Sequence, residues 1–296
     1  STSTYTEEPE DMGFGHPLQR MVNLETLDER SEGFLGNHAL YRMPVAGSSS
    51  TSSHYYFVDF EAVVDEYLAQ YAAVDPQDVV FVQPEPDGPP SNIPSLILRS
   101  IPSAGQELAI LQHLNAGEVR RDPWNPAPRL LYAATKGERT VLCLERLFEY
   151  DQPPFQTVYD VVDYVRQTLE GLSFLHEQRI VHAAYGDHRG VMMDIGRPSM
   201  DAFDRAQFPV RYYRISFARA QQLAHDASIH GPLFQKDVRD CGAMLARQFE
   251  GVPRVYNKLK SLTGAMMGRA FGAEDARKLF EALCKSIDSA TYETRL

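Results

Sequence analysis

The sequence contains little cysteine, and what it has is scattered. Cys143, Cys241 and Cys284 are far apart and show no C-x-x-C spacing. Neither a disulfide framework nor a zinc site is therefore expected. Each cysteine falls in an apolar segment with the period of a helix or a strand. We predict buried free thiols, no metal ion, and a cytoplasmic protein.

Long apolar runs and an excess of basic residues are also missing. No stretch approaches the roughly 18 apolar residues that a membrane helix needs, and no signal-peptide pattern is visible. The chain has 40 acidic against 29 basic residues, a net charge of -11. Because no basic excess is available to neutralise phosphates, we expect neither nucleic acid nor a membrane as a partner.

The 296 residues suffice for one sizeable core, or for two lobes that share a cleft. Residues 1–30 begin acidic and are interrupted by proline and glycine, which predicts an extended arm. A connector of glycine, serine and threonine follows at 47–53, and a proline-rich loop at 84–94. The regular elements must therefore lie between and after these segments.

Apolar periodicity predicts strands first and long helices later, which is an α+β pattern. The predicted strands cover residues 35–45, 79–82, 96–99, 129–132, 140–145, 191–194 and 210–218. The predicted helices cover residues 59–71, 105–116, 159–177 and 274–287, with a further helix beginning near 234–237.

The stretch after the helix at 159–177 has the most specific pattern. The helix ends in L-S-F-L-H-E, and I-V-H, a polar loop and an apolar V-M-M-D strand follow. This order resembles the catalytic loop of protein kinases, H-R-D-x-x-x-x-N, in which Asp accepts the substrate proton and Asn holds a metal ion. His182 matches the pattern. Ala183 and Ala184 stand at the Arg and Asp positions, and Arg189 or Gly190 stands at the Asn position.

Two further segments resemble kinase motifs in the same order along the chain. The strand L-I-L-R and the following helix place Arg99 and Glu107 where kinases have the Lys–Glu pair of the nucleotide site. The segment V-R-Y-Y-R-I-S-F-A resembles the strand that carries D-F-G, with Ser216 and Ala218 in place of Asp and Gly. The G-x-G-x-x-G loop that covers ATP in kinases has no counterpart in this sequence.

The phrases P-P-F-x-T-V, F-L-H-E and P-V-R-Y-Y resemble a group of fungal kinase-like proteins, over about residues 90–250. The resemblance implies a bilobal fold, with a β-rich N-lobe at 31–147, one helix beside its sheet, and a helical C-lobe at 148–296. It implies an ion pair between Arg99 and Glu107. It also implies a buried Asp237 at a helix start, bonded to backbone near His182.

The degenerate motifs predict a pseudokinase, a catalytically inactive kinase-like domain that acts as a binding or regulatory module without a cofactor. Its partner would be a protein that the sequence does not identify, and the cleft could still hold a weakly bound nucleotide or another small ligand. Arg99 and Glu107 would then form a degenerate nucleotide site, and His182, Ala184, Gly190 and Ser216 would mark the lost catalytic positions.

Two alternatives remain open. One is an enzyme with repurposed cleft chemistry, in which Asp187 and His188 form an acid–base pair; a solvated polar turn would explain the same residues. The other is a divergent ATP-dependent phosphotransferase, in which Asp187 or Asp194 replaces the missing acids.

Overall fold

The computed structural model describes residues 38–43, 54–71, 80–82, 96–196, 203–205, 210–268 and 271–296. The strands are β1 His38–Met43, β2 His54–Asp59, β3 Val80–Val82, β4 Leu96–Pro102, β5 Leu130–Lys136, β6 Arg139–Glu145, β7 Phe148–Glu149, β8 Ile180–Val181, β9 Val191–Asp194, β10 Arg211–Arg214 and β11 Gln221–Gln222. The helices are α2 Phe60–Tyr71, α3 Glu107–Leu114, α4 Gly117–Arg121, α5 Val158–Glu177, the 3-10 turn η1 His188–Gly190, α6 Pro232–Phe249, α7 Pro253–Met267, α8 Ala273–Lys285 and α9 Ser289–Tyr292.

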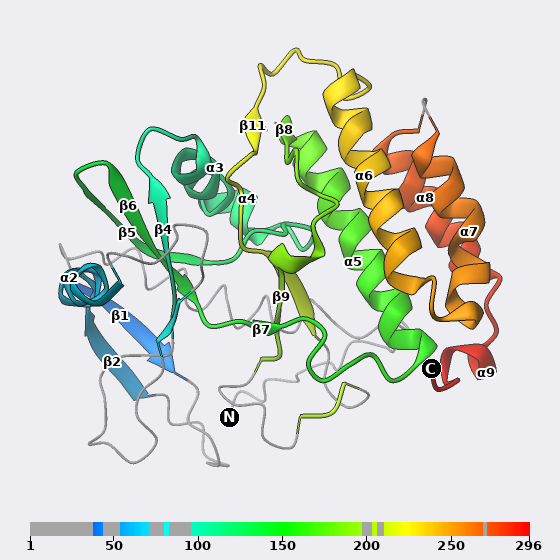
Figure 1. Cartoon of the computed structure of the whole chain (residues 1–296), viewed down its shortest axis with the longest axis horizontal. Coiled ribbons are helices and arrows are strands. Elements are labelled where there is room, and N and C mark those ends of the chain that lie inside the picture. Colours follow the sequence, from blue (N-terminus) through cyan, green and yellow to red (C-terminus); the bar gives the residue numbers. More distant parts are fainter. Residues whose placement is uncertain are drawn as a thin grey trace, which may run out of the picture.

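The fold is α+β, as predicted, with small antiparallel sheets and several helices. Figure 1 shows the four-stranded sheet and α3 on one side and the long helices α5 to α8 on the other. We refer to these as the strand-rich part and the helical part. The predicted arm at residues 1–30 lies outside the described residues, as do the connector at 47–53 and the loop at 84–94.

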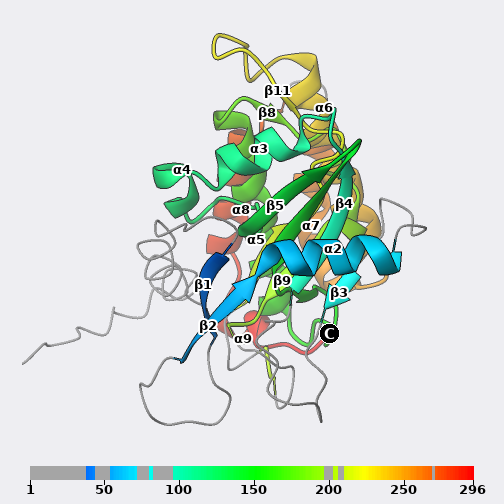
Figure 2. The same ribbon diagram turned by 90° about the vertical axis from the view of Figure 1, so that its left-hand side faces the viewer.

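The four-stranded sheet has the order β3-β4-β6-β5 and is covered on both faces. Alternate residues of a strand point to opposite faces. Leu96 and Leu98 of β4 therefore pack with α2, in a small core that includes Val64 and Phe60. Ile97, between the two leucines, belongs to the main core together with the buried face of α3. Figure 2 shows α2 lying across the sheet.

The helical part is built around α5, which is buried along most of its length. The helix begins with a capping box, in which the Thr157 side chain accepts a hydrogen bond from the Asp160 backbone N–H and the Asp160 carboxylate accepts one from the Thr157 N–H. Helices α6 and α8 pack against it. One apolar core runs without interruption from Ile97 of β4 to Ile287 after α8, so the sheet and the helices share it.

Most predicted elements are present, with a few corrections. The sheet is accompanied by more than the one helix that the kinase resemblance implies: α2 matches the helix predicted at 59–71, and the short helix α4 was not predicted. The strand predicted at 210–218 is shorter than expected and consists of β10 alone. Beyond β10, the backbone N–H of Ile215 donates to the carbonyl oxygen of Gly190, and that of Phe217 donates to the Glu107 carboxylate. Helix α7 was not predicted.

The cysteines are free thiols, as predicted: Cys143 and Cys241 are buried and Cys284 is partly buried. Burial raises the pKa of both Cys143 and Cys241 to about 12, so neither is a thiolate at neutral pH. Among the helices that the structure describes, none is long and apolar enough to cross a membrane.

Gly242 allows the closest approach between α6 and α7. A Cβ atom at this position would lie 2.7 Å from Cβ of Met266 and 3.3 Å from the carbonyl oxygen of Thr263. We expect Gly242→Ala to lower the free energy of unfolding by about 1–3 kcal/mol through this steric conflict. Gly264→Ala is the matched control, because its Cβ would meet nothing within 4 Å. Chemical denaturation measures both, and an equal effect of the two substitutions would contradict the packing argument.

Candidate functional site

A buried ion pair links the strand and the helix that the kinase resemblance singles out. Nη1 of Arg99, on β4, lies 2.8 Å from Oε1 of Glu107, the first residue of α3. The two side chains are each 4% exposed. The predicted proximity of Arg99 and Glu107 is therefore confirmed. With both charges out of water, each depends on the other for compensation.

The segment that follows β10 closes over this pair. Arg99 donates from Nη1 to the carbonyl oxygen of Ile215 and from Nη2 to the Ser216 hydroxyl at 3.3 Å. The backbone N–H of Phe217 donates to Oε1 of Glu107 at 2.7 Å. The S-F-A segment therefore supplies backbone and hydroxyl partners to the two ions. It brings no carboxylate to them.

Asp237 holds the turn that contains His182. Its carboxylate is fully buried and accepts hydrogen bonds from the backbone N–H groups of His182 at 2.7 Å and Ala183 at 2.8 Å. Ala183 has a φ of 58°, the left-handed region that residues with a side chain rarely adopt. The predicted contact is confirmed, although Asp237 lies one turn inside α6 and not at its first residue.

His182 is a buried neutral ring. It is 4% exposed and lies edge-on to Tyr185 and Phe217, with ring centroids 5.4 and 5.2 Å away. Burial, with a smaller contribution from the positive charge of Arg214, lowers the pKa of His182 to about 3. At neutral pH the His182 ring is therefore uncharged, and it acts as a packing residue.

Sequence reasoning missed Arg214, a buried cation that contacts the loop after His182. Its Nη1 donates to the carbonyl oxygen of Asp187 at 3.2 Å, and its guanidinium lies 3.7 Å from the ring centre of Tyr185. The Tyr185 hydroxyl in turn donates to the carbonyl oxygen of Thr168 on α5 at 2.7 Å. No pattern in the sequence indicates this role for Arg214, because a strand arginine is usually exposed.

The Asp187 carboxylate, one half of the predicted acid–base pair with His188, is bonded to Arg189. The Asp187 carboxylate accepts from Nε of Arg189 at 3.0 Å and from Nη2 at 2.9 Å, and it caps η1 through the Arg189 backbone N–H. These bonds lower the pKa of Asp187. The His188 ring lies edge-on to Tyr150, 6.4 Å between centroids. Asp187 and His188 therefore belong to a surface turn that Arg189 closes through its bonds to Asp187.

The two remaining degenerate positions carry no reactive group. Ala184 is half-buried, and its carbonyl oxygen accepts the Asp187 backbone N–H at 3.0 Å. The Gly190 carbonyl oxygen accepts the Ile215 backbone N–H, also at 3.0 Å. A Cβ atom on Gly190 would meet nothing within 4 Å. Both residues shape the turn through their main chains.

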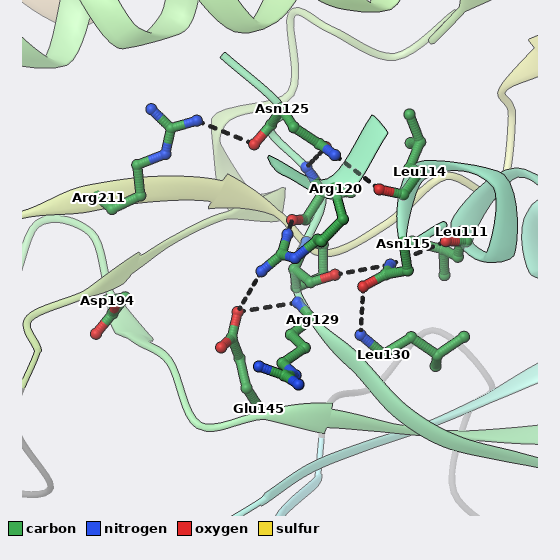
Figure 3. Close-up of polar contacts among 12 residues, drawn as sticks. Leu111, Leu114, Asn115, Arg120, Asn125, Arg129, Leu130, Glu145, Asp194 and Arg211 are labelled. Carbon is green, nitrogen blue, oxygen red and sulfur yellow. Dashed lines mark hydrogen bonds and ion pairs between the residues drawn. The ribbon is translucent and has the colours of Figure 1, made fainter. Parts of the chain in front are cut away.

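A second buried polar cluster lies where β6 ends (Figure 3). The Glu145 carboxylate accepts the Arg129 backbone N–H at 2.9 Å and lies 3.7 Å from Nη2 of Arg120. Burial is the largest effect on this carboxyl and raises the pKa of Glu145, with the charge of Asp194 acting in the same direction. Glu145 therefore joins α4 to the end of the sheet.

Two asparagines anchor the segment between α3 and β5 in the same cluster (Figure 3). Asn125 donates to the carbonyl oxygens of Leu114 and Val119, at 2.7 and 2.9 Å, and its own carbonyl oxygen accepts from Arg211 at 3.0 Å. Asn115 donates to Pro128 and accepts from Leu130. Two sequence signals could have indicated these roles: Asn115 stands at a helix end, and Asn125 precedes a proline.

No family model matches the chain, and no curated protein matches it. Within the residues that the structure describes, no three His, Cys, Asp or Glu side chains gather where they could hold a metal ion.

We expect Asp237→Ala to lower the free energy of unfolding by about 2–4 kcal/mol, because two buried backbone donors lose their acceptor. Asp187→Ala removes a carboxylate whose side chain is 43% exposed and should cost about 1 kcal/mol or less. Urea denaturation of both variants measures the difference. Equal losses would contradict the role of Asp237 in holding the turn.

His182 should make the protein sensitive to acid. The pKa of His182 is about 3 in the folded protein and about 6.5 in the unfolded chain. Between these values only the unfolded chain takes up the proton, so stability falls as pH decreases, by up to about 1.4 kcal/mol per pH unit. His182→Phe keeps the ring packing and removes this dependence.

The measurement compares the free energy of unfolding of wild type and His182→Phe at several pH values from neutral to about pH 4. The difference between the two proteins isolates His182 from the buried carboxyls, whose raised pKa values act in the opposite direction. Parallel pH profiles would show that His182 titrates normally.

Proposed function

We propose that the chain has a bilobal protein kinase-like fold and acts as a non-catalytic binding or regulatory module. The order of elements supports the fold. Strand β4 with Arg99 is followed by α3 with Glu107, then by β6, the central helix α5, the His182 turn, the hairpin of β9 and β10, and α6 with Asp237. The contacts expected of this order, Arg99 with Glu107 and Asp237 with the His182 turn, are both present.

The closed Arg99–Glu107 pair is the observation that carries the functional proposal. In the kinase-like frame this is where nucleotide phosphates and a metal ion would meet. Arg99 is 3% exposed and is bonded to Glu107, Ile215 and Ser216. A phosphate would have to displace these partners, and breaking a buried ion pair costs several kcal/mol. Ser216 offers a neutral hydroxyl, which is a poor substitute for a metal-binding carboxylate.

The loop that would supply the proton acceptor supports the same conclusion. Ala184 has no side-chain acid, and the nearby Asp187 is held by Arg189. Phosphoryl transfer depends mainly on positioned groups and on metal-assisted charge stabilisation. A chain that lacks a positioned acid at both motifs has little means of accelerating it.

The apolar core between the two parts also favours a binding module. Ile97 and Leu144 of the sheet, Leu147 after it, and Met193 of β9 belong to one core, and none of them is more than 1% exposed. These side chains are buried members of that core, so they offer no exposed apolar surface to a flat base. A ligand at this position would have to displace packed methyl and thioether groups.

The prediction is that wild-type protein transfers no phosphate and is not stabilised by Mg-ATP. Measurements are radiolabel transfer from ATP with magnesium or manganese, and a thermal melt with and without Mg-ATP. An active protein kinase serves as the positive control. Ligand binding at a hundred times Kd would add about 2.7 kcal/mol of stability, an effect that such a melt resolves.

Three variants separate the alternatives. Transfer by wild type that Asp187→Ala or Asp194→Ala abolishes would identify a divergent phosphotransferase and overturn the proposal. Weak nucleotide binding without transfer would leave the binding-module proposal intact, provided that Arg99→Ala reduces the binding.

A further inference from the structure

Helix α7 presents a basic surface on an acidic protein. The stretch from residue 251 to 273 contains four basic residues and no aspartate or glutamate, in a chain with 40 acidic and 29 basic residues. Three of the four, Arg254, Lys258 and Lys260, lie on α7. Figure 1 shows α7 at the side of the helical part that is farthest from the sheet.

The two faces of α7 differ sharply. Val255, Leu259, Leu262, Thr263 and Met266 are buried against the rest of the helical part. The opposite face, which we call the α7 face, consists of exposed residues at helical spacing: Arg254, Asn257, Lys260, Ser261, Gly264 and Met267. It combines cations at its edges with small residues at its centre.

The cations of the α7 face lack carboxylate partners. Among the described residues, no ion pair within 4.0 Å joins Arg254 or Lys260 to a carboxylate, and Arg254 donates from Nη1 to the Arg295 carbonyl oxygen at 3.4 Å. Helices α6 and α8 differ in this respect. Lys236 pairs with Asp240, and Arg277 pairs with Glu274 and Glu281. The positive charge of the α7 face is therefore available to a ligand.

Two observations indicate a peptide-like ligand. Met267 is 45% exposed, so an apolar contact surface adjoins the cations. A Cβ on Gly264 would meet nothing within 4 Å, which leaves room for another backbone to approach closely.

Extended polyanions such as nucleic acid or an anionic bilayer would experience the repulsion of a chain with net charge -11. A short acidic segment engages the local charge alone.

We propose that the α7 face binds an acidic segment of a partner protein, with its carboxylates on Arg254 and Lys260 and an apolar side chain against Met267. The site lies on another element than the Arg99 pair. It rests on the proposed function as a binding module and gives that module a partner of defined chemistry. The peptide-binding test is independent of the test for phosphate transfer.

The experiment uses the full chain and a fluorescent synthetic peptide of Glu and Asp with Leu at helical spacing. Fluorescence anisotropy gives Kd at about 0.03 M and about 0.3 M salt. Wild type should bind, and Arg254→Glu/Lys260→Glu should weaken binding about tenfold or more at low salt. Met267→Ser should weaken the binding that remains at high salt.

The control is Arg121→Glu/Arg219→Glu, which makes the same change in net charge at exposed positions outside α7, and in which Arg121 also loses its ion pair with Glu118. Equal melting temperatures of the variants verify that each is folded. The proposal is overturned if wild type does not bind the peptide, or if the control weakens binding as much as the α7 variant does. Equal or tighter binding of single-stranded DNA or phosphatidylserine vesicles would also overturn it, because the face would then bind any polyanion.

Discussion

The buried ion pair between Arg99 and Glu107 is the constraint on which the junction of the two parts depends. Neither ion is stable in the interior alone, because an uncompensated buried charge costs several kcal/mol. Both ions make further hydrogen bonds to Ile215, Ser216 and Phe217, more than 100 residues later in the chain. Strand β4, helix α3 and the segment after β10 must therefore fold together, and the functional proposal follows from the same closure.

Glu145 and Asn125 strengthen this junction by other means. Glu145 ties the end of the sheet to α4. Asn125 donates to a carbonyl oxygen at the end of α3 and to one on α4, and Arg211 of β10 donates to the Asn125 backbone carbonyl oxygen. Hydrogen bonds to buried backbone groups are expensive to leave unmade. The polar residues of the interior therefore position the elements, while the shared apolar core supplies most of the driving force.

The predictable parts of the structure were those with strong local patterns. Short continuous apolar runs identified β4 and β6, helical spacing identified α5 and α8, and motif spacing led to Arg99, Glu107 and Asp237. Arg214 could not be predicted, because its burial depends on the ring of Tyr185 and a carbonyl oxygen in a distant loop. The burial of Arg99 could not be predicted either. Motif spacing indicated Glu107 as its partner, but only the fold shows that the pair is shielded from water.

The continuous core has a consequence for how the protein unfolds. Ile97 and Leu144 of the sheet and Met193 of β9 belong to the same apolar core as α5. Separating them would expose surface that costs about 25 cal/mol for each Å². The sheet and the helices are therefore expected to unfold together, in one cooperative transition.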